Sequence, residues 1–302
     1  MAGVIEIIGT ESLGVRGLSC VITTDTRCVV IDPGVALGYL RHGLLPHPLQ
    51  VATGVRVRQR IVEVLKEATD IVISHFHGDH IPLREANPYQ LAIGDLPQHC
   101  KNTRCWGKSQ DSQPKHIKQR AADIIEFLGA NFHAAEGCTD GPLVFSKGVP
   151  HGGSENGPVS QVMMCRIDLG DRVFVHASDI QLLDAETIEH IIDWRPDIVL
   201  AAGPPLYLSA LSNDQRREAW KNGLRLAEKV ETVILDHHLM RDLQGPEWLT
   251  ALSVEVGKKI YCAADFMQTE RLLFEAQRAR LYKTNPVPQG WHEDYETRAA
   301  HC

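Results

Sequence analysis

Three histidines and an aspartate fall within six positions of the segment "DIVISHFHGDHIPL", residues 70–83. The β-branched run Ile71–Ile73 predicts a buried strand and Gly78 breaks regular structure, so these side chains stand where a strand gives way to a turn. Side chains alternate along a strand, and His75 and His77 therefore point the same way if the backbone stays extended. Neutral imidazoles crowded in this way would bind a cation, and a metal ion is the simplest one.

Two more donors follow directly after the glycine. Asp79 and His80 lie on a tighter path, which can aim a carboxylate and a third imidazole at a second ion about 3.5 to 4 Å away, the spacing of two-metal hydrolases. The alternative is a polar surface turn that happens to be rich in histidine. Partner ligands elsewhere in the chain would decide between the two.

Three later segments also place a donor just beyond an expected strand. His151 follows the strand in "PLVFSKGVPHGG", Asp179 follows the strand in "DRVFVHASDIQ", and His237 and His238 follow the strand in "ETVILDHHLMRD". One such residue alone is usually a turn former. Together they complete two sites: His75, His77 and His151 form the first, Asp79, His80 and one of His237 or His238 form the second, and Asp179 bridges them.

This inventory would supply each of two ions with nitrogen and oxygen ligands and leave a position open for water. We therefore expect two divalent ions per chain, zinc first, with manganese or iron as alternatives. An extended backbone would turn only one of His237 and His238 toward the metals, so we predict His237 as the ligand and His238 as a proton donor or substrate contact. Asp79 and Asp179 can orient a water molecule, and Asp79 can also pass a proton to the leaving group.

These residues resemble a known family. "HFHGDH" matches the His-x-His-x-Asp-His signature of the metallo-β-lactamase superfamily, and a distant His, Asp and His follow in that family's order. "VIDPGVALG", "HFHGDHIPLREANPYQL" and "LDHHLMRD" are similar to a branch known only as predicted metal-dependent hydrolases. The resemblance implies an α+β fold, a four-layer αββα sandwich, with a dinuclear site and a structural role for Asp32. Di-iron members carry glutamate where this chain has His77, which favours zinc or manganese and hydrolysis.

Alternating strands and helices must position these residues. We predict three opening strands in "GVIEIIGT", "LSCVITT" and "RCVVIDPG", a helix in "GVRVRQRIVEVLKEA", and helices over residues 115–129, 184–193, 213–229, 246–256 and 268–282. Further strands are expected near residues 143, 161, 172, 197, 231 and 259, with a loop-rich stretch over 84–114. Strands outnumber crossover helices, which favours two sheet layers covered by helices. We expect one domain over residues 1–302, with residues 283–302 as a C-terminal surface arm.

Composition limits the function classes. The formal net charge of −7 and the lack of a long basic block argue against a broad nucleic-acid-binding surface. We find no stretch of about 18 uncharged apolar residues that could span a membrane, and no signal-peptide pattern at the N-terminus, so we expect a cytoplasmic protein without a membrane partner. The eight cysteines are scattered and are expected to be reduced.

Candidate substrate contacts lie on loops. Arg16 in "ESLGVRG" could bind a phosphate or carboxylate through two N–H groups, and Trp106 and Lys108 in "KNTRCWGKS" could bind a phosphorylated molecule. Each could equally be a surface or structural residue. The function we predict is hydrolysis of a small, anionic phosphodiester, ester, thioester or lactone by a metal-bound hydroxide. The alternatives are a metal-binding protein with a structural or regulatory role and a mononuclear iron oxidoreductase on the same fold.

Overall fold

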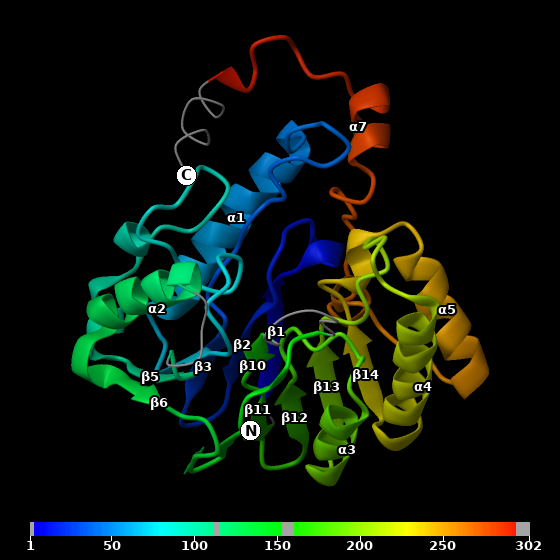
Figure 1. The fold of residues 1–302 in the computed structure, drawn as a ribbon. Helices are drawn as coiled ribbons and strands as arrows, with labels where there is room; N and C mark the ends of the chain where they lie inside the picture. Colours follow the sequence, from blue (N-terminus) through cyan, green and yellow to red (C-terminus); the bar gives the residue numbers. More distant parts are fainter. Residues whose placement is uncertain (1–2, 111–114, 153–159, 294–302) are drawn as a thin grey trace.

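Two mixed β-sheets form the centre of the computed structural model, and helices cover their outer faces (Figure 1). The structure describes residues 3–110, 115–152 and 160–293. The first sheet has the order β1-β2-β3-β4-β5-β6, with bounds Val4–Gly9, Ser19–Thr23, Cys28–Ile31, Asp70–Ile73, Arg104–Gly107 and Phe132–Ala134. β1 to β3 pair antiparallel, whereas β3 to β6 pair parallel. Helices α1 (Pro48–Leu65) and α2 (Lys115–Leu128) pack on its outer face.

The second sheet has the order β14-β13-β12-β11-β8-β7, with bounds Thr232–Leu235, Ile198–Ala201, Val173–His176, Cys165–Asp168, Leu143–Phe145 and Thr139–Asp140. β12, β13 and β14 are parallel, and the others are antiparallel. Helices α3 (Ala185–Asp193), α4 (Asn213–Lys229) and α5 (Gly245–Val256) cover it on the right of Figure 1, opposite α1 and α2.

Shorter elements connect these layers. β9 (Val149–Pro150) and β10 (Gln161–Val162) form a separate two-stranded sheet. Two short helices, α6 (Ala263–Phe266) and α7 (Arg278–Thr284), follow α5. Five 3-10 helices occur in the described ranges: η1 (Glu11–Leu13), η2 (Ile93–Asp95), η3 (Gln98–Asn102), η4 (Gly129–Asn131) and η5 (Leu239–Arg241).

A buried layer between the two sheets fixes their positions. Ile22 and Ile31 of the first sheet and Phe174 and Ile234 of the second are fully buried in one apolar cluster. Each such side chain contributes about 1.5 to 3 kcal/mol relative to an exposed one. Because β3 and β4 are parallel within one sheet, and β12 and β14 within the other, their carboxyl ends can bring the loops that follow them together.

The predicted αββα sandwich is confirmed, and five predicted helices are present as α1 to α5. The first of these begins at Pro48, six residues before the predicted start at Gly54. Proline suits the first turn of a helix, and the His47 ring accepts a hydrogen bond from Leu49 N at 3.2 Å as a cap.

The helix predicted over residues 268–282 is wrong for residues 268–277, and only its end is helical, in α7. Gln268 adopts a positive φ of 55°, which ends α6, and Leu272 N donates to Ser12 O at 2.7 Å instead of to a helical carbonyl. Contacts with distant residues therefore override the local helical pattern. The strand expected near residue 259 is reduced to one bridge between Tyr261 and Ile234, and the stretch expected to be loop-rich contains β5.

The described part of the predicted C-terminal arm contacts the rest of the protein. In the predicted arm, His292 contacts Tyr282 Oη at 2.9 Å and Trp291 packs against the cluster under α1; residues 294–302 lie outside the described residues. The single-domain organisation stays a prediction. Within the described ranges, every helix is too short or too polar to cross a lipid bilayer.

Candidate metal centre

Segments far apart in the sequence place three imidazoles side by side. His75 and His77 follow β4, and His151 follows β9. The ring centroids of His75 and His77 are 4.5 Å apart, and the His151 ring lies 5.5 Å from the first and 5.0 Å from the second. One donor atom of each of these histidines and of Asp179 lies within 4.8 Å of the others. The first predicted ligand group is thus assembled in space, and metal binding by it stays a prediction.

Asp179 lies at the centre of the cluster and is almost fully buried. Its Oδ2 atom lies 3.2 Å from His151 Nε2 and 3.7 Å from His75 Nε2, and its Oδ1 atom lies 3.1 Å from His80 Nε2. Ser178 precedes it with a positive φ of 56°, and Ser178 Oγ donates to Ser74 Oγ at 2.7 Å. The backbone before Asp179 is therefore held in a strained turn by the loop that follows β4.

A second group of donor atoms contains Asp79. Asp79, His80 and His237 each offer a donor atom within 4.8 Å of the others. His237 Nε2 lies 3.4 Å from Asp79 Oδ2, and the ring centroids of His80 and His237 are 5.3 Å apart. These are the residues predicted to hold the second ion.

The reason given for choosing between His237 and His238 is wrong. The prediction assumed an extended pair, but His238 has helical angles, φ −78° and ψ −38°, because η5 begins directly after it. Both Nε2 atoms consequently approach Asp179 Oδ2, at 3.7 Å from His237 and 3.4 Å from His238. Both also belong with Asp179 to a further group of donor atoms within 4.8 Å.

The two histidines differ in their other contacts. His237 Nδ1 accepts a hydrogen bond from Gly17 N at 3.2 Å, whereas His238 Nδ1 lies 3.1 Å from Tyr207 Oη. His238 Nε2 is buried and has no hydrogen-bond partner in the described part of the chain. Position places His237 with the second ligand group, and His238 has an Nε2 atom without a hydrogen-bond partner among the described residues.

Asp32 braces the loop that carries the histidines, which is the role predicted for it. Its carboxylate accepts from Ser74 N at 2.8 Å and from Ser74 Oγ at 2.6 Å, and His80 Nδ1 lies 2.9 Å from it. The close packing also explains Gly34 in the same motif, since a Cβ there would lie 2.2 Å from the carbonyl carbon of His80. Asp32 thereby orients the His80 ring so that Nε2 faces Asp179.

The donor atoms suit metal ions. Among the described residues, the buried atoms His75 Nε2, His80 Nε2 and Asp179 Oδ1 also lack hydrogen-bond partners, and such atoms are costly unless something binds them. Burial lowers the pKa of His77 to about 4 and the pKa of His75 well below its usual value, so both imidazoles are neutral and can donate lone pairs. The residues therefore fit divalent cations bound by nitrogen and oxygen.

His80 is the exception among these histidines. Burial lowers its pKa, but the carboxylates of Asp179 and Asp32 outweigh burial and raise the pKa well above its usual value. Asp179 responds in the opposite sense: burial raises its pKa, but the surrounding imidazoles, His80 first, hold it well below its usual value.

A buried arginine beside the centre was missed from the sequence. Arg241 Nε donates to Glu11 Oε1 at 2.7 Å, Nη1 donates to Tyr207 Oη at 3.1 Å, and Nη2 lies 3.1 Å from His237 Nε2. Its position four residues after His237 is the spacing of side chains on one helical face, and this signal could have identified it. Tyr207 also contacts the centre, since its Oη atom lies 3.1 Å from His238 Nδ1.

No family model matches the sequence. A UPF0282 protein of Methanosarcina mazei is 47% identical over 292 residues, which cover 97% of this chain and 96% of the relative. A UPF0282 protein of Thermococcus gammatolerans is 33% identical over 299 residues, which cover 91% and 94%. The chain belongs to the UPF0282 family.

Among solved structures, this UPF0282 family member is similar to the metallo-β-lactamase fold protein YhfI from Bacillus subtilis. The TM-score is 0.50 at 12% identity, and the match covers 87% of this chain and 96% of that chain. At this identity the likeness shows the fold alone. It confirms the metallo-β-lactamase fold that the resemblance of "HFHGDH" implied.

The three predicted substrate contacts are engaged by other residues. Arg16 donates through Nε to Glu275 Oε2 at 2.8 Å and through Nη2 to the other oxygen, with its side chain 28% exposed. Trp106 Nε1 donates to Asp70 Oδ1 at 3.0 Å, at the end of β4 opposite the histidines, and Lys108 Nζ pairs with Glu136 at 2.6 Å. These contacts match the structural alternatives, and substrate binding by the three side chains stays a prediction.

Proposed function

We propose that this protein is a dinuclear metal-dependent hydrolase acting on a small ester, thioester, lactone or phosphodiester. The observation that supports this most directly is the position of the Asp179 carboxylate, with one oxygen 3.2 Å from His151 Nε2 of the first group and the other 3.1 Å from His80 Nε2 of the second. A purely structural zinc site is usually closed by four ligands, whereas a carboxylate shared by two groups suits a two-metal site. We propose zinc for both ions, with manganese or iron as alternatives.

Divalent ions at this centre would lower the pKa of a water molecule toward neutrality and polarise a carbonyl or phosphoryl oxygen of the substrate. The side chains of the protein hold the reacting groups in place. Asp179 is held from both sides, and the Asp79 side chain, 20% exposed, can accept and return a proton at the mouth of the centre. His238, fixed by Tyr207, is placed to bind an ion or to donate a proton to the leaving group.

Positive charge beside the centre supports an anionic substrate. The guanidinium groups of Arg41 and Arg241 lie 5.4 and 5.2 Å from the centre of the Tyr207 ring. Arg16 adds a third guanidinium group in contact with the same network, with its Nε 3.9 Å from Glu11. Glu275 pairs with Arg16 and Glu11 pairs with Arg241, so Arg41 is the guanidinium group of the three that would attract an anion.

The test combines metal analysis with a substrate screen. Protein purified without added metal is analysed by mass spectrometry for its elements, then loaded with zinc, manganese or iron and assayed on chromogenic phosphodiesters, thioesters, lactones and β-lactams. We expect about two ions per chain and a hydrolysis rate that rises with pH through an apparent pKa near 7 that belongs to the loaded centre.

Three results would contradict the proposal. One tightly held ion without turnover of any substrate would indicate a structural or regulatory metal site. A single iron with oxygen-dependent turnover would indicate an oxidoreductase. Hydrolysis that persists after chelation and dialysis would show that the metals are not required.

A further inference from the structure

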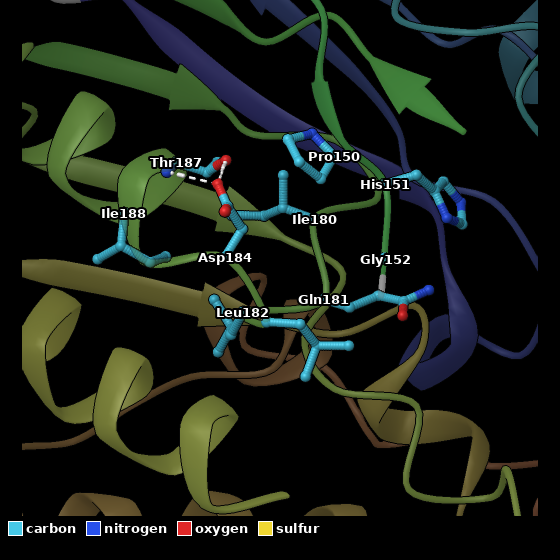
Figure 2. Close-up of a pocket in the computed structure, with 10 residues that line it drawn as sticks. Pro150, His151, Gly152, Ile180, Gln181, Leu182, Asp184, Thr187 and Ile188 are labelled. Carbon is cyan, nitrogen blue, oxygen red and sulfur yellow. Dashed lines mark hydrogen bonds between the residues drawn. The ribbon is translucent and has the colours of Figure 1, made fainter. Parts of the chain in front are cut away.

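A small apolar cavity opens beside the metal centre (Figure 2). Its volume is about 210 Å³, and its apolar wall is formed by Pro150, Ile180, Leu182, Leu183 and Ile188. Ile180, Leu182 and Ile188 are almost fully buried and belong to the core under α3 and α4. A preformed hollow with such a wall binds an apolar group without a rearrangement of the core.

The cavity and the metal centre share a boundary. His151 lines the cavity, and its Nε2 atom lies 3.2 Å from Asp179 Oδ2. Ile180, the residue directly after Asp179, forms part of the apolar wall. Two consecutive residues, Asp179 and Ile180, therefore provide a predicted metal ligand and a part of the cavity wall.

Polar residues lie on two sides of the cavity, with Gln181 near His151 and with Asp184 and Thr187 near Ile188. In Figure 2 the Gln181 amide lies next to Gly152 and on the same side as the His151 ring, whereas Ile188 lies across the pocket. A Cβ at Gly152 would lie 2.3 Å from Gln181 Oε1, so glycine is what allows the amide to cover this part of the backbone.

Asp184 and Thr187 are polar residues that also line the cavity. The Asp184 carboxylate accepts hydrogen bonds from Thr187 N at 2.8 Å and from Thr187 Oγ1, both within the first turn of α3. Asp184 therefore caps the helix through one oxygen atom, Oδ2. The part of the lining that matches a hydrocarbon group is formed by Ile180, Leu182 and Ile188.

We infer that this cavity binds an apolar substituent of the substrate while the group to be cleaved lies at the metal centre. The inference rests on the proposed function and adds the substrate class: an ester, thioester, lactone or phosphodiester that carries a compact hydrocarbon group. An apolar cavity of roughly 150 Å³ holds a benzene molecule. The volume here accordingly suits a branched, cyclic or linear group of about six to eight carbon atoms.

The first arm of the test uses metal-free protein, so that it does not depend on the proposed function. Benzene is titrated into protein whose isoleucine δ1 methyl groups carry ¹³C, and the signals of Ile180 and Ile188 are followed. We expect saturable shifts of both signals in the wild type. Leu183→Trp fills the cavity and abolishes the shifts, whereas the matched control Leu49→Trp, at a position 47% exposed on α1, retains them. Unchanged signals in the wild type, or equal shifts in Leu183→Trp, overturn the inference.

The second arm uses zinc-loaded protein and linear hydroxamates from two to eight carbons. Affinity is expected to rise about fourfold for each buried methylene until the cavity is full, and to stay flat in Leu183→Trp. Leu183→Ala enlarges the cavity and moves the optimum to longer chains, which keeps the test decisive if the tryptophan variant fails to fold. If benzene binds but acetohydroxamate does not, the result contradicts the proposed metal centre and leaves the cavity inference intact. Acetohydroxamate that binds with no dependence on chain length contradicts the inference alone.

Discussion

Tyr207 Oη lies 3.1 Å from His238 Nδ1, on the side of the imidazole opposite the Nε2 atom that approaches Asp179. Arg241 donates to the same phenolic oxygen, also from 3.1 Å. When Nδ1–H donates to Tyr207, the lone pair of the neutral ring is on Nε2, where a metal ion can use it. Tyr207 is therefore placed to select the tautomer of a predicted catalytic histidine.

Replacing Tyr207 by phenylalanine tests this relationship. Loss of the hydroxyl frees the His238 ring, and we expect metal affinity to fall about tenfold, the lower end of what such orienting partners contribute. The measurement is competition for zinc with a chromogenic chelator, with the fold checked by circular dichroism. Unchanged zinc affinity in Tyr207→Phe would contradict the tautomer argument.

A double-mutant cycle distinguishes the two histidines. Because both Nε2 atoms reach Asp179, we expect His237→Ala and His238→Ala each to reduce zinc affinity at least tenfold. Tyr207→Phe should add little to His238→Ala, since its effect acts through that ring, but should add fully to His237→Ala. If the effects on zinc affinity are fully additive in both double variants, Tyr207 does not act through His238.

Asp179 should matter to both ions at once. Asp179→Asn keeps the shape of the side chain but removes the charge that faces several imidazoles, so we expect bound metal to fall from about two ions per chain to less than one. Any hydrolysis should fall by on the order of a hundredfold or more. Metal content and rate are measured on the same samples, and loss of a single ion with the second fully retained would contradict the shared position of Asp179.

The sequence predicted the donor set better than its arrangement. "HFHGDH" and the three later strand ends identify the residues that meet in space, because strand ends and glycine turns are local features that a sequence displays. The conformation of His238 depends on η5, and the contact between Arg241 and Glu11 joins residues 230 positions apart. The break at Gln268 has the same cause, since contacts with η1 override a local helical pattern. Such features arise from packing and could not be read along the chain.

Asp32→Ala should lower stability and metal binding together. The change leaves Ser74 N–H and Ser74 Oγ–H buried without their acceptor, and an unsatisfied buried group costs about 1 to 3 kcal/mol. The His80 ring also loses its support. We expect a fall of about 3 kcal/mol in the free energy of unfolding, measured by urea titration of metal-free protein, and weaker zinc binding. Full stability together with full metal content would show that Asp32 does not brace the loop.

The ion pair between Arg16 and Glu275 should make stability depend on pH in the acid range. Burial raises the pKa of Glu275, but Arg16 outweighs burial and holds this pKa at about 2, below the usual value of 4.5. A carboxyl whose folded pKa is depressed stabilises the fold above its unfolded pKa, and this contribution is lost as the pH falls from about 4.5 toward 2.

We therefore expect Glu275→Gln to lower the free energy of unfolding of metal-free protein by about 2 kcal/mol at pH 7 and by much less at pH 3. Urea titrations at the two pH values measure the difference, and Arg60→Gln, which breaks a more exposed pair with Glu6, is the matched control with a small effect at both. If Glu275→Gln lowers the free energy of unfolding by the same amount at pH 3 as at pH 7, the ion pair with Arg16 does not set the pKa of Glu275.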